Sequence, residues 1–439
     1  MKKDKINKYQ WLQTVCCFFY LLLLLSLAQP VCAQSSGPSS EADQKGFGGP
    51  DSTQKRIASD RTRTETILDL GFLKPWYEWK DNLQKEHGLA FGAEYNAVYL
   101  KASDSLPGAD DDSGGGIFRF RSAWEAFGRG TDHSGTLMFL VEHTHGYTDT
   151  LPSSFAGESL GYAGISNLNS NDDGWRLNTL YWDQKFQNGR YEVFAGFLDV
   201  SDYLDVYPLT SPWTDFFNYA FSIGAGALDL PSDGALGIVG GAWLTQSFYA
   251  MAGFVDQNAD ATDPFEGFDT FWNDHEFFKH IEIGWTGASQ EAWFLNNVHL
   301  TMWHADERDE MGVEDGWGGV LSFTHSIGDE WLVFARTGFS EDGGSLLERS
   351  VSIGGGYTPG GLQLLGSGSQ LGFAANWGRP NEALFGADLD DQYAIEGYFR
   401  WKVSDEIAIT PSVQLLIDPA LNPEEDSIWV YGLRARLAF

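Results

Sequence analysis

The sequence predicts an all-β protein: an antiparallel transmembrane β-barrel of about sixteen strands, preceded by a short N-terminal helix. Three observations support this prediction. The last strand alternates strictly, with Trp429, Tyr431 and Leu433 on one face and Arg434 and Arg436 on the other. Similar segments recur along the chain, and the connections between them are alternately long and short. No apolar run beyond residue 33 is long enough to form a transmembrane helix.

The arginines of the last strand decide which of its faces meets lipid. An arginine that faces lipid at the bilayer midplane costs about 2–4 kcal/mol. Arg434 and Arg436 are therefore expected to face a polar lumen, while the apolar face contacts outer-membrane lipid and lipopolysaccharide. The terminal Phe439 is typical of outer-membrane barrels and is expected to be recognised by the barrel assembly machinery. The predicted location is the outer membrane of a Gram-negative bacterium.

Residues 1–33 have the composition of a signal peptide. Four lysines precede an apolar run over residues 11–28, and residues 31–33 (VCA) fit the small residues before a cleavage site. The alternative is a membrane anchor, since a run of about 18 residues can span a bilayer. All three cysteines lie in this segment, so a cleaved chain would carry no thiol, no disulfide and no cysteine metal site.

The remainder of the chain divides into three parts. Residues 34–74 are polar and poor in aromatic residues, which predicts a flexible periplasmic lead. Residues 75–88 predict a short helix that ends at Gly88, and this helix either plugs or braces the barrel base or simply caps it. Residues 89–439 are expected to form the outer-membrane β-barrel.

The strands of that barrel follow from alternation and from turn residues between them. An even strand number places both ends of the barrel on the periplasmic side, with the long connections outside. The expected strands are 89–101, 116–129, 134–147, 173–186, 189–199, 235–244, 247–256, 276–287, 293–305, 314–327, 330–340, 348–358, 368–378, 391–402, 406–418 and 427–439.

The acidic character of the chain excludes some partners. A formal net charge of −33 disfavours nucleic acid. Acidic residues gather in the expected loops, for example at residues 110–112 and 424–426. They indicate either solvated surface or sites for divalent cations, and no spacing matches a calcium loop. We expect no cofactor and no metal site.

Alternation also predicts which side chains line the lumen. Their charges are of both signs, whereas an anion pore would carry a basic ring and a cation pore an acidic ring. Neutral sugars need donors and acceptors together, which Arg and Glu supply, and aromatic faces on which to pack. The alternative is that these charges only neutralise each other. The expected pore-lining residues are Glu94, Arg119, Arg121, Glu125, Arg190, Glu192, Glu396, Tyr398 and Arg400.

Two parts of the chain carry a resemblance to a known family. The first comprises residues 196–205 (GFLDVSDYLD) and 216–221 (FFNYAF). The second part comprises residues 396–400 (EGYFR), 409–414 (ITPSVQ), 418–423 (DPALNP) and 430–434 (VYGLR). In the order and spacing of all these pieces, the chain resembles the carbohydrate-selective porins of the OprB type.

The resemblance implies a sixteen-stranded barrel through which mono- or oligosaccharides cross the outer membrane by passive, selective diffusion. It also implies a constriction of charged and polar groups, and an extracellular segment that folds inward after the strand ending near Asp199. In this sequence that segment is 200–234, with Trp213, Phe216 and Phe217 as its constriction residues. Porins of this size occur as homotrimers or as monomers.

Other classes of function fit the sequence less well. His143 and His145 share one strand face while Glu142 lies on the other, which makes a metal site awkward. Asp199, Asp202 and Asp205 resemble the paired acids of glycoside hydrolases, but at a strand end they fit loop capping and hydrogen bonding better. We therefore expect that the protein is not an enzyme. The alternative function is a general or ion-selective porin without sugar preference.

Overall fold

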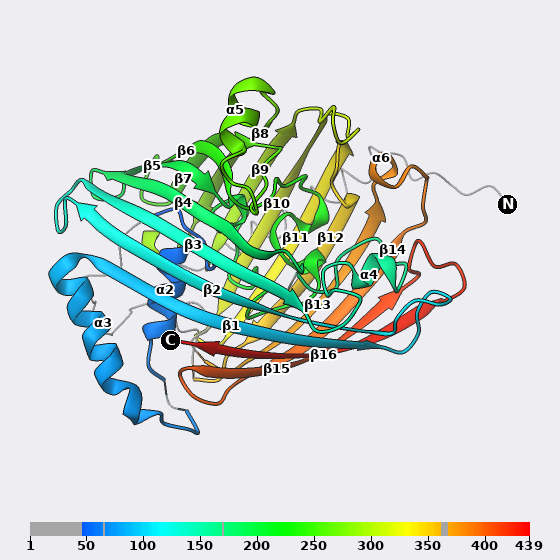
Figure 1. Cartoon of the computed structure of the whole chain (residues 1–439), viewed down its shortest axis with the longest axis horizontal. Coiled ribbons are helices and arrows are strands. Elements are labelled where there is room, and N and C mark those ends of the chain that lie inside the picture. Colours follow the sequence, from blue (N-terminus) through cyan, green and yellow to red (C-terminus); the bar gives the residue numbers. More distant parts are fainter. Residues whose placement is uncertain (1–45, 65, 169–170, 361–367) are drawn as a thin grey trace. The chain divides into compact units, whose positions relative to one another are not determined.

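The strands follow one another around the barrel in the order of the sequence. The structure is a computed structural model and describes residues 46–64, 66–168, 171–360 and 368–439. Sixteen antiparallel strands pair with their neighbours along the chain, and β16 pairs with β1 to close the barrel (Figure 1). The prediction of a sixteen-stranded antiparallel barrel is confirmed. The strands are β1 (Leu89–Ala102), β2 (Asp112–Phe127), β3 (Ser134–Gly146), β4 (Gly174–Phe186), β5 (Tyr191–Leu198), β6 (Ala235–Trp243), β7 (Phe248–Asp256), β8 (Phe277–Thr286), β9 (Asn297–Ala305), β10 (Gly316–Ile327), β11 (Trp331–Asp342), β12 (Leu347–Tyr357), β13 (Gln370–Pro380), β14 (Gln392–Lys402), β15 (Ile407–Ile417) and β16 (Ser427–Ala438).

The carboxyl terminus completes the closure between the first and last strands. The backbone N of Phe439 donates to the carbonyl of Ala93 at 2.8 Å, and the N of Ala93 donates to the carbonyl of Phe439 at 3.1 Å. The register of this pair sets Tyr99 opposite Leu433. Because every strand has a partner on both sides, the barrel leaves no strand edge unpaired, as hydrocarbon surroundings require.

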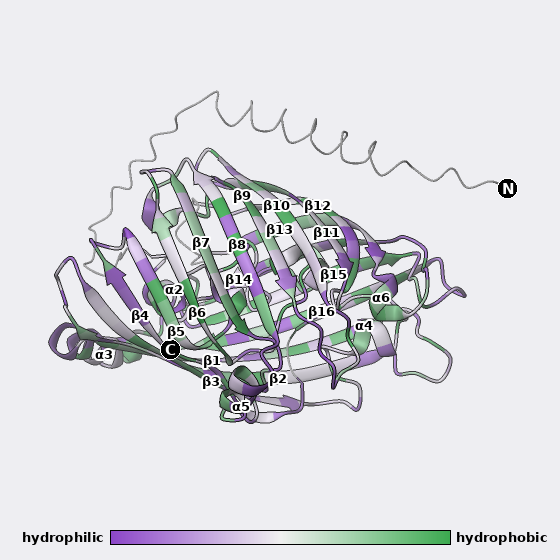
Figure 2. Cartoon of the chain, turned by 90° about the horizontal axis from the view of Figure 1, so that it is seen from above, coloured by the Kyte–Doolittle hydropathy of each residue, from purple (hydrophilic) through white to green (hydrophobic). Residues whose placement is uncertain are grey.

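Side chains alternate between the two faces of the barrel wall. In β16, Tyr431 and Leu433 are 53% and 51% exposed on the outer face, whereas Arg434 is 1% exposed on the inner face. In β8, Ile283 is exposed and its neighbour Glu282 is buried. Figure 2 shows hydrophobic and hydrophilic residues alternating along the strands. The outer face is therefore the one suited to hydrocarbon, and the charged groups collect in the lumen.

The connections give the barrel two different ends. The longest, 199–234 and 147–173, lie with the other odd-to-even connections at what we call the long-loop end. The opposite end, the short-turn end, contains tight turns such as 187–190 and 244–247, and β1 starts and β16 ends there. The alternation has exceptions, since β11 and β12 are joined at the long-loop end by residues 343–346 alone.

The predicted helix before the first strand is present as α3 (Lys74–His87), beside β1. Gly88 ends it with a φ of 72°, a left-handed conformation that glycine adopts without strain. Trp76 and Trp79 of α3 pack edge-on against Phe91 of β1, with ring centroids 5.9 and 5.6 Å apart. Within the described ranges, no helix combines the length and apolar character needed to cross a membrane.

Apart from α2, which is described below, the other helices are short. One of them precedes α3, and the rest lie in connections between strands. They are η1 (Gly71–Leu73), α4 (Phe155–Glu158), η2 (Val200–Asp202), η3 (Tyr219–Phe221), η4 (Ile223–Gly226), α5 (Gly267–Asn273), η5 (Gln290–Ala292) and α6 (Glu382–Phe385).

The chain before α3 differs from the expected flexible lead. Helix α2 (Thr53–Arg61) contacts β1, β2 and β3, and its Arg56 and Ile57 are buried. The amino-acid composition did not predict this buried helix. A short polar helix whose charges are paired inside a lumen has the same composition as a solvated segment. The predicted signal peptide, residues 1–33, and residues 34–45 of the lead lie outside the described residues.

Candidate functional site

The connection between β5 and β6 folds into the lumen. This lumenal loop, residues 199–234, is buried over most of its length. Arg336 on β11 forms an ion pair with Asp205 of the loop. Arg434 on β16 donates a hydrogen bond of 2.7 Å to the carbonyl of Pro212. The loop therefore reaches strands that lie far from β5 and β6 around the barrel, and it crosses the lumen.

Three of the predicted pore-lining residues hold this loop in place. Glu396 accepts hydrogen bonds from the backbone N–H groups of residues 217–218, at 2.7 and 2.9 Å. Arg400 and the hydroxyl of Tyr398 both donate to Oδ1 of Asp215, each at 3.1 Å. All three side chains are buried. Glu396 and Tyr398 are occupied by the loop, whereas Arg400 holds the loop and also lines a cavity described below.

A second element, the N-terminal segment of residues 46–64, also lies within the lumen. Phe47 is buried among aromatic rings of β6 and β7, and its backbone N donates to Glu192 at 2.6 Å. The backbone N of Gly49 donates to the carbonyl of Asp202 at 2.6 Å, which joins the segment to the lumenal loop. Glu192, predicted to line the pore, thus binds the chain itself.

A row of alternating charges runs along the inner wall over four neighbouring strands. Glu94, Arg119, Glu142 and Arg176, on β1 to β4, are direct cross-strand partners. Nε of Arg119 lies 2.6 Å from Glu142, and Nε of Arg176 lies 3.3 Å from the same carboxylate. Glu94 also pairs with Arg121. Because opposite charges on facing residues attract each other, the row fixes the positions of these long side chains.

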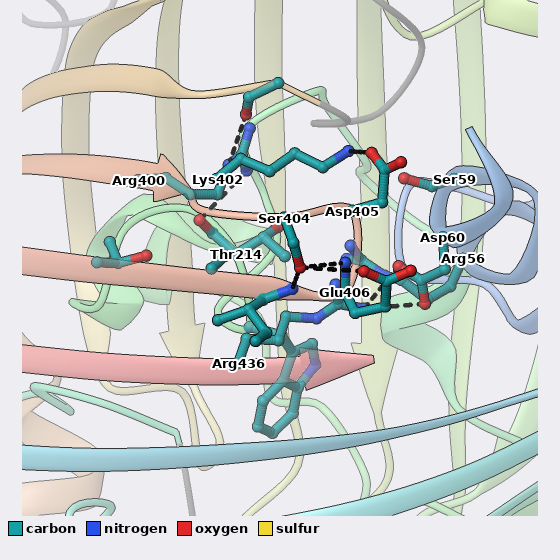
Figure 3. Close-up of a pocket in the computed structure, with 15 residues that line it drawn as sticks. Arg56, Ser59, Asp60, Thr214, Arg400, Lys402, Ser404, Asp405, Glu406 and Arg436 are labelled. Atoms are coloured by element: carbon teal, nitrogen blue, oxygen red, sulfur yellow. Dashed lines mark hydrogen bonds and ion pairs between the residues drawn. The ribbon is translucent and has the colours of Figure 1, made fainter. Parts of the chain in front are cut away.

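Two cavities lined by described residues of the lumen are bordered by Trp213. The outer cavity, towards the long-loop end, has a volume of about 390 Å³. The inner cavity, beside the β14–β15 turn at the short-turn end, has a volume of about 30 Å³, which is the space of one or two water molecules. Figure 3 shows side chains of α2, of the β14–β15 turn and of β16 gathered around the inner cavity.

The cavities are separated by what we call the neck: Asp51, Arg56, Ser211 and Trp213. Asp51 lines the outer cavity and Arg56 lines the inner one, and the two form an ion pair. Ser211 accepts from Arg56 at 2.9 Å and donates to Asp51 at 2.8 Å. The guanidinium of Arg119 lies 4.4 Å from the ring centroid of Trp213, a cation–π contact that fixes the indole.

The other two expected constriction residues do not border the cavities. Phe216 packs edge-on against Tyr398 with ring centroids 5.0 Å apart. Phe217 lies beneath the guanidinium of Arg434, 4.4 Å from it. Both belong to an apolar cluster between the lumenal loop and the wall. Of the three aromatic residues named from the resemblance, only Trp213 stands at the neck.

Two further predicted pore residues lie elsewhere. Arg190 is exposed in the turn between β4 and β5, with its guanidinium 5.4 Å from the ring of Tyr191. The prediction placed it in the lumen because it extended the strand beyond Tyr191, the residue at which β5 begins. Glu125 lies half-buried near the short-turn end of β2 and lines neither cavity.

Several residues of the site were not predicted. Glu142 shares the inner face of β3 with Leu140 and Thr144, so alternation alone would have found it. The residues of the N-terminal segment gave no such signal, because their lumenal position depends on contacts with distant strands. The residues that line the outer cavity and were not predicted include Asp51, Glu142, Arg176, Asn178, Asp199 and Asp202.

Burial changes the acidity of carboxyl groups in the lumenal loop. Burial, reinforced by the nearby charge of Asp199, raises the pKa of Asp202 well above its ordinary value. Burial likewise raises the pKa of Asp199. Burial also opposes the ionisation of Asp205, but Arg336 and His299 hold its pKa below the ordinary value. Within the described ranges, no group of three or more metal-ligating side chains comes together.

Comparisons with known proteins bear on this architecture. The family model described as "Carbohydrate-selective porin, OprB family" matches residues 78–311 and 317–439. A high-pH structure of OprB from Pseudomonas putida superposes with a TM-score of 0.64 at 14% identity, over 83% of this chain and 97% of that one. A low-pH structure of the same protein gives 0.49 at 12% identity, over 86% and 100%. None of the curated proteins matches the sequence.

Proposed function

Because the chain belongs to the OprB family of carbohydrate-selective porins, we propose that sugars diffuse through its lumen from the outer cavity, past the neck, to the inner cavity. Its function is that of a carbohydrate-selective porin, and its fold is that of a channel. The observation that carries the proposed path is that Trp213 borders both cavities. A solute that moves between them has to pass this indole.

The groups around Trp213 suit the chemistry of a sugar. The indole offers an apolar face to the C–H groups of a sugar ring. Arg119 supplies hydrogen-bond donors and Glu142 supplies acceptors to the hydroxyl groups. We assign sugar contact to these three side chains. Glu94 and Arg121 act by holding Arg119 and its row, while Glu396, Tyr398 and Arg400 act by holding the lumenal loop.

Binding along this path is weak, because a sugar has to leave as readily as it enters. Millimolar affinity corresponds to about −4 kcal/mol. The inner cavity of about 30 Å³ is smaller than a sugar, so the path has to widen during passage. We assign this widening to the N-terminal segment, because it supplies Asp51 and Arg56 of the neck.

The proposal also includes the membrane in which the protein lies and its orientation there. The family and the barrel fold are those of proteins of the Gram-negative outer membrane. We place the exposed apolar outer face in contact with lipid and lipopolysaccharide, and the long-loop end outside the cell. We also propose that the barrel assembly machinery recognises Phe439. The protein is either a homotrimer or a monomer in this proposal.

Swelling of liposomes that contain the purified protein tests the function. We expect swelling in mono- and oligosaccharide solutions, with rates that differ between sugars. Arg119→Ala should change the rates or their order, and Arg190→Ala is the matched control because it removes an exposed arginine of the β4–β5 turn. Absence of swelling in every sugar would refute sugar passage. Equal rates for all sugars and for salts of similar size would indicate a general porin.

A further inference from the structure

The carboxyl groups of the outer cavity outnumber its arginines. Most of them are paired. Glu142 binds Arg119 and Arg176, and Asp233 also binds Arg176. The remaining pairs are Asp51 with Arg56 and Asp229 with Arg308.

Asp199 and Asp202 differ from the other carboxyl groups of this cavity. Within the described parts of the chain, neither has a lysine or arginine at ion-pair distance. Asp199 accepts hydrogen bonds from Ser201 at 2.6 and 2.8 Å and from Asn178 at 3.2 Å, all neutral groups. The two carboxyl groups therefore give this side of the cavity an uncompensated acidic character whenever they are ionised.

A second observation at the same place concerns hydrogen-bond acceptors without donors. Oδ2 of Asp202, Oδ1 of Asn178 and Oγ1 of Thr210 are buried, and no described residue forms a hydrogen bond with any of them. The three residues are 3%, 2% and 4% exposed, and all three line the outer cavity. A buried acceptor that lacks a donor is costly, so a solute that brings donors here gains more than it would at a saturated surface.

We infer that Asn178, Asp199, Asp202 and Thr210 form an acceptor-rich subsite that favours neutral sugars and amino sugars over sugars that carry a carboxylate or phosphate. The inference rests on the proposed sugar passage and names its substrate class. Hydroxyl groups donate to the free oxygens, and an ammonium group also gains from Asp199 and Asp202 once these are ionised. An anionic sugar then meets like charge at this subsite, and like charges in a confined site repel strongly.

The subsite lies beside the neck. Gly49 of the N-terminal segment donates to the carbonyl of Asp202, and Asp51 lines the same cavity. A sugar in the outer cavity can therefore contact both the subsite and Trp213, which lines this cavity as well. Arg119 and Arg176 offset the acidic side only in part, because their guanidinium groups are already bound to Glu142, although the charge of Arg119 still acts on Asp202.

Current block in planar bilayers tests the inference with defined probes. Glucose, glucosamine hydrochloride and sodium glucuronate are added at equal ionic strength, and the half-blocking concentration of each is measured. We expect glucosamine to block at about tenfold lower concentration than glucuronate, which corresponds to about 1.4 kcal/mol. Asp202→Asn should reduce this ratio by about threefold. Thr210→Val should weaken the block by glucose without changing the ratio.

Two controls keep the outcomes distinct. Asp388→Asn removes a carboxylate from an exposed part of the β13–β14 loop and should leave the ratio unchanged. Retention of the heat-modifiable band in electrophoresis shows that each variant has folded. If glucose passes and glucuronate blocks as well as glucosamine, the subsite inference is wrong and the porin function stands. If no sugar either blocks or passes, the proposed function fails instead.

Discussion

Nη2 of Arg436, on the last strand, donates hydrogen bonds to both carboxylate oxygens of Asp60 on α2, at 2.8 and 2.9 Å. Nε of the same arginine donates to Glu94 on the first strand at 2.6 Å. The barrel closes where β1 pairs with β16. One guanidinium therefore connects this strand pair with helix α2 inside the barrel. Three charged groups that lie far apart in the sequence meet here, and they hold the N-terminal segment against the wall.

We expect this segment to limit the conductance of the channel. Phe47→Ala combined with Arg56→Ala removes the aromatic anchor and the ion pair with Asp51. Loss of a buried phenylalanine alone costs about 3–5 kcal/mol of packing. The segment should then leave the neck more often, and single-channel conductance in planar bilayers should rise above that of the wild type.

The matched control for this variant is Phe72→Ala. Phe72 is 76% exposed in η1, so its truncation repeats the Phe→Ala part of the double variant without loss of a buried anchor. Its conductance should equal that of the wild type. A conductance that stays unchanged in the double variant, with the barrel folded, would show that the N-terminal segment does not restrict the path.

The barrel could be predicted from the sequence because its signals are local. Alternation and turn residues placed β15 at 406–418, within one residue of its observed bounds at each end. The position of a side chain at a strand end was less secure, and an error of two residues moved Arg190 from the turn into the lumen. Period-two patterns identify an inner face, but they do not distinguish a charge that meets water from one that meets protein.

The contents of the lumen could not be predicted, because they depend on contacts between distant segments. Glu396 lies on the inner face, but its partners are the backbone N–H groups of residues 217–218. No local pattern in the sequence indicates such a pairing. The same holds for Phe47, whose aromatic neighbours Trp243 and Tyr249 come from strands about 200 residues further along the chain.

Removal of the indole at the neck should weaken sugar binding. Trp213→Ala deletes the aromatic face that borders both cavities, and such contacts contribute about 0.5–1.5 kcal/mol beyond area burial. The half-blocking concentration of glucose should therefore rise by about two- to tenfold. Trp272→Ala, an exposed tryptophan on α5, is the matched control and should leave the block unchanged. Equal block in both variants would exclude Trp213 from the sugar path.

Glu396 should affect the channel through the lumenal loop. Glu396→Gln removes a buried carboxylate that accepts two backbone hydrogen bonds, and hydrogen bonds to charged groups contribute about 1.5–3 kcal/mol each. The loop should become susceptible to limited proteolysis within residues 199–234, and the open-channel current should become noisier. Glu382→Gln, on the exposed α6, should change neither readout. A loop that remains resistant to protease in Glu396→Gln would contradict this positioning role.

The ion selectivity of the channel should depend on pH through Asp202. Its pKa is raised by burial and by Asp199, so the carboxyl group stays neutral at pH values where an ordinary aspartate is ionised. As the pH rises through the raised pKa, Asp202 gains a negative charge, and Asp199, whose pKa is also raised, changes in the same direction. The charged groups that act on Asp202 are Asp199, Arg119, Asp51 and Arg121.

Arginines keep their charge over this range, so they do not reverse the sign of the change. The permeability ratio of K⁺ to Cl⁻, measured from zero-current potentials in a KCl gradient, should therefore increase with pH. Asp202→Asn should flatten the increase, because an amide does not ionise, while Asp388→Asn in the exposed loop should retain it. A ratio that falls with rising pH, or an increase that persists in full in Asp202→Asn, would show that the acidic side of the outer cavity does not set the selectivity.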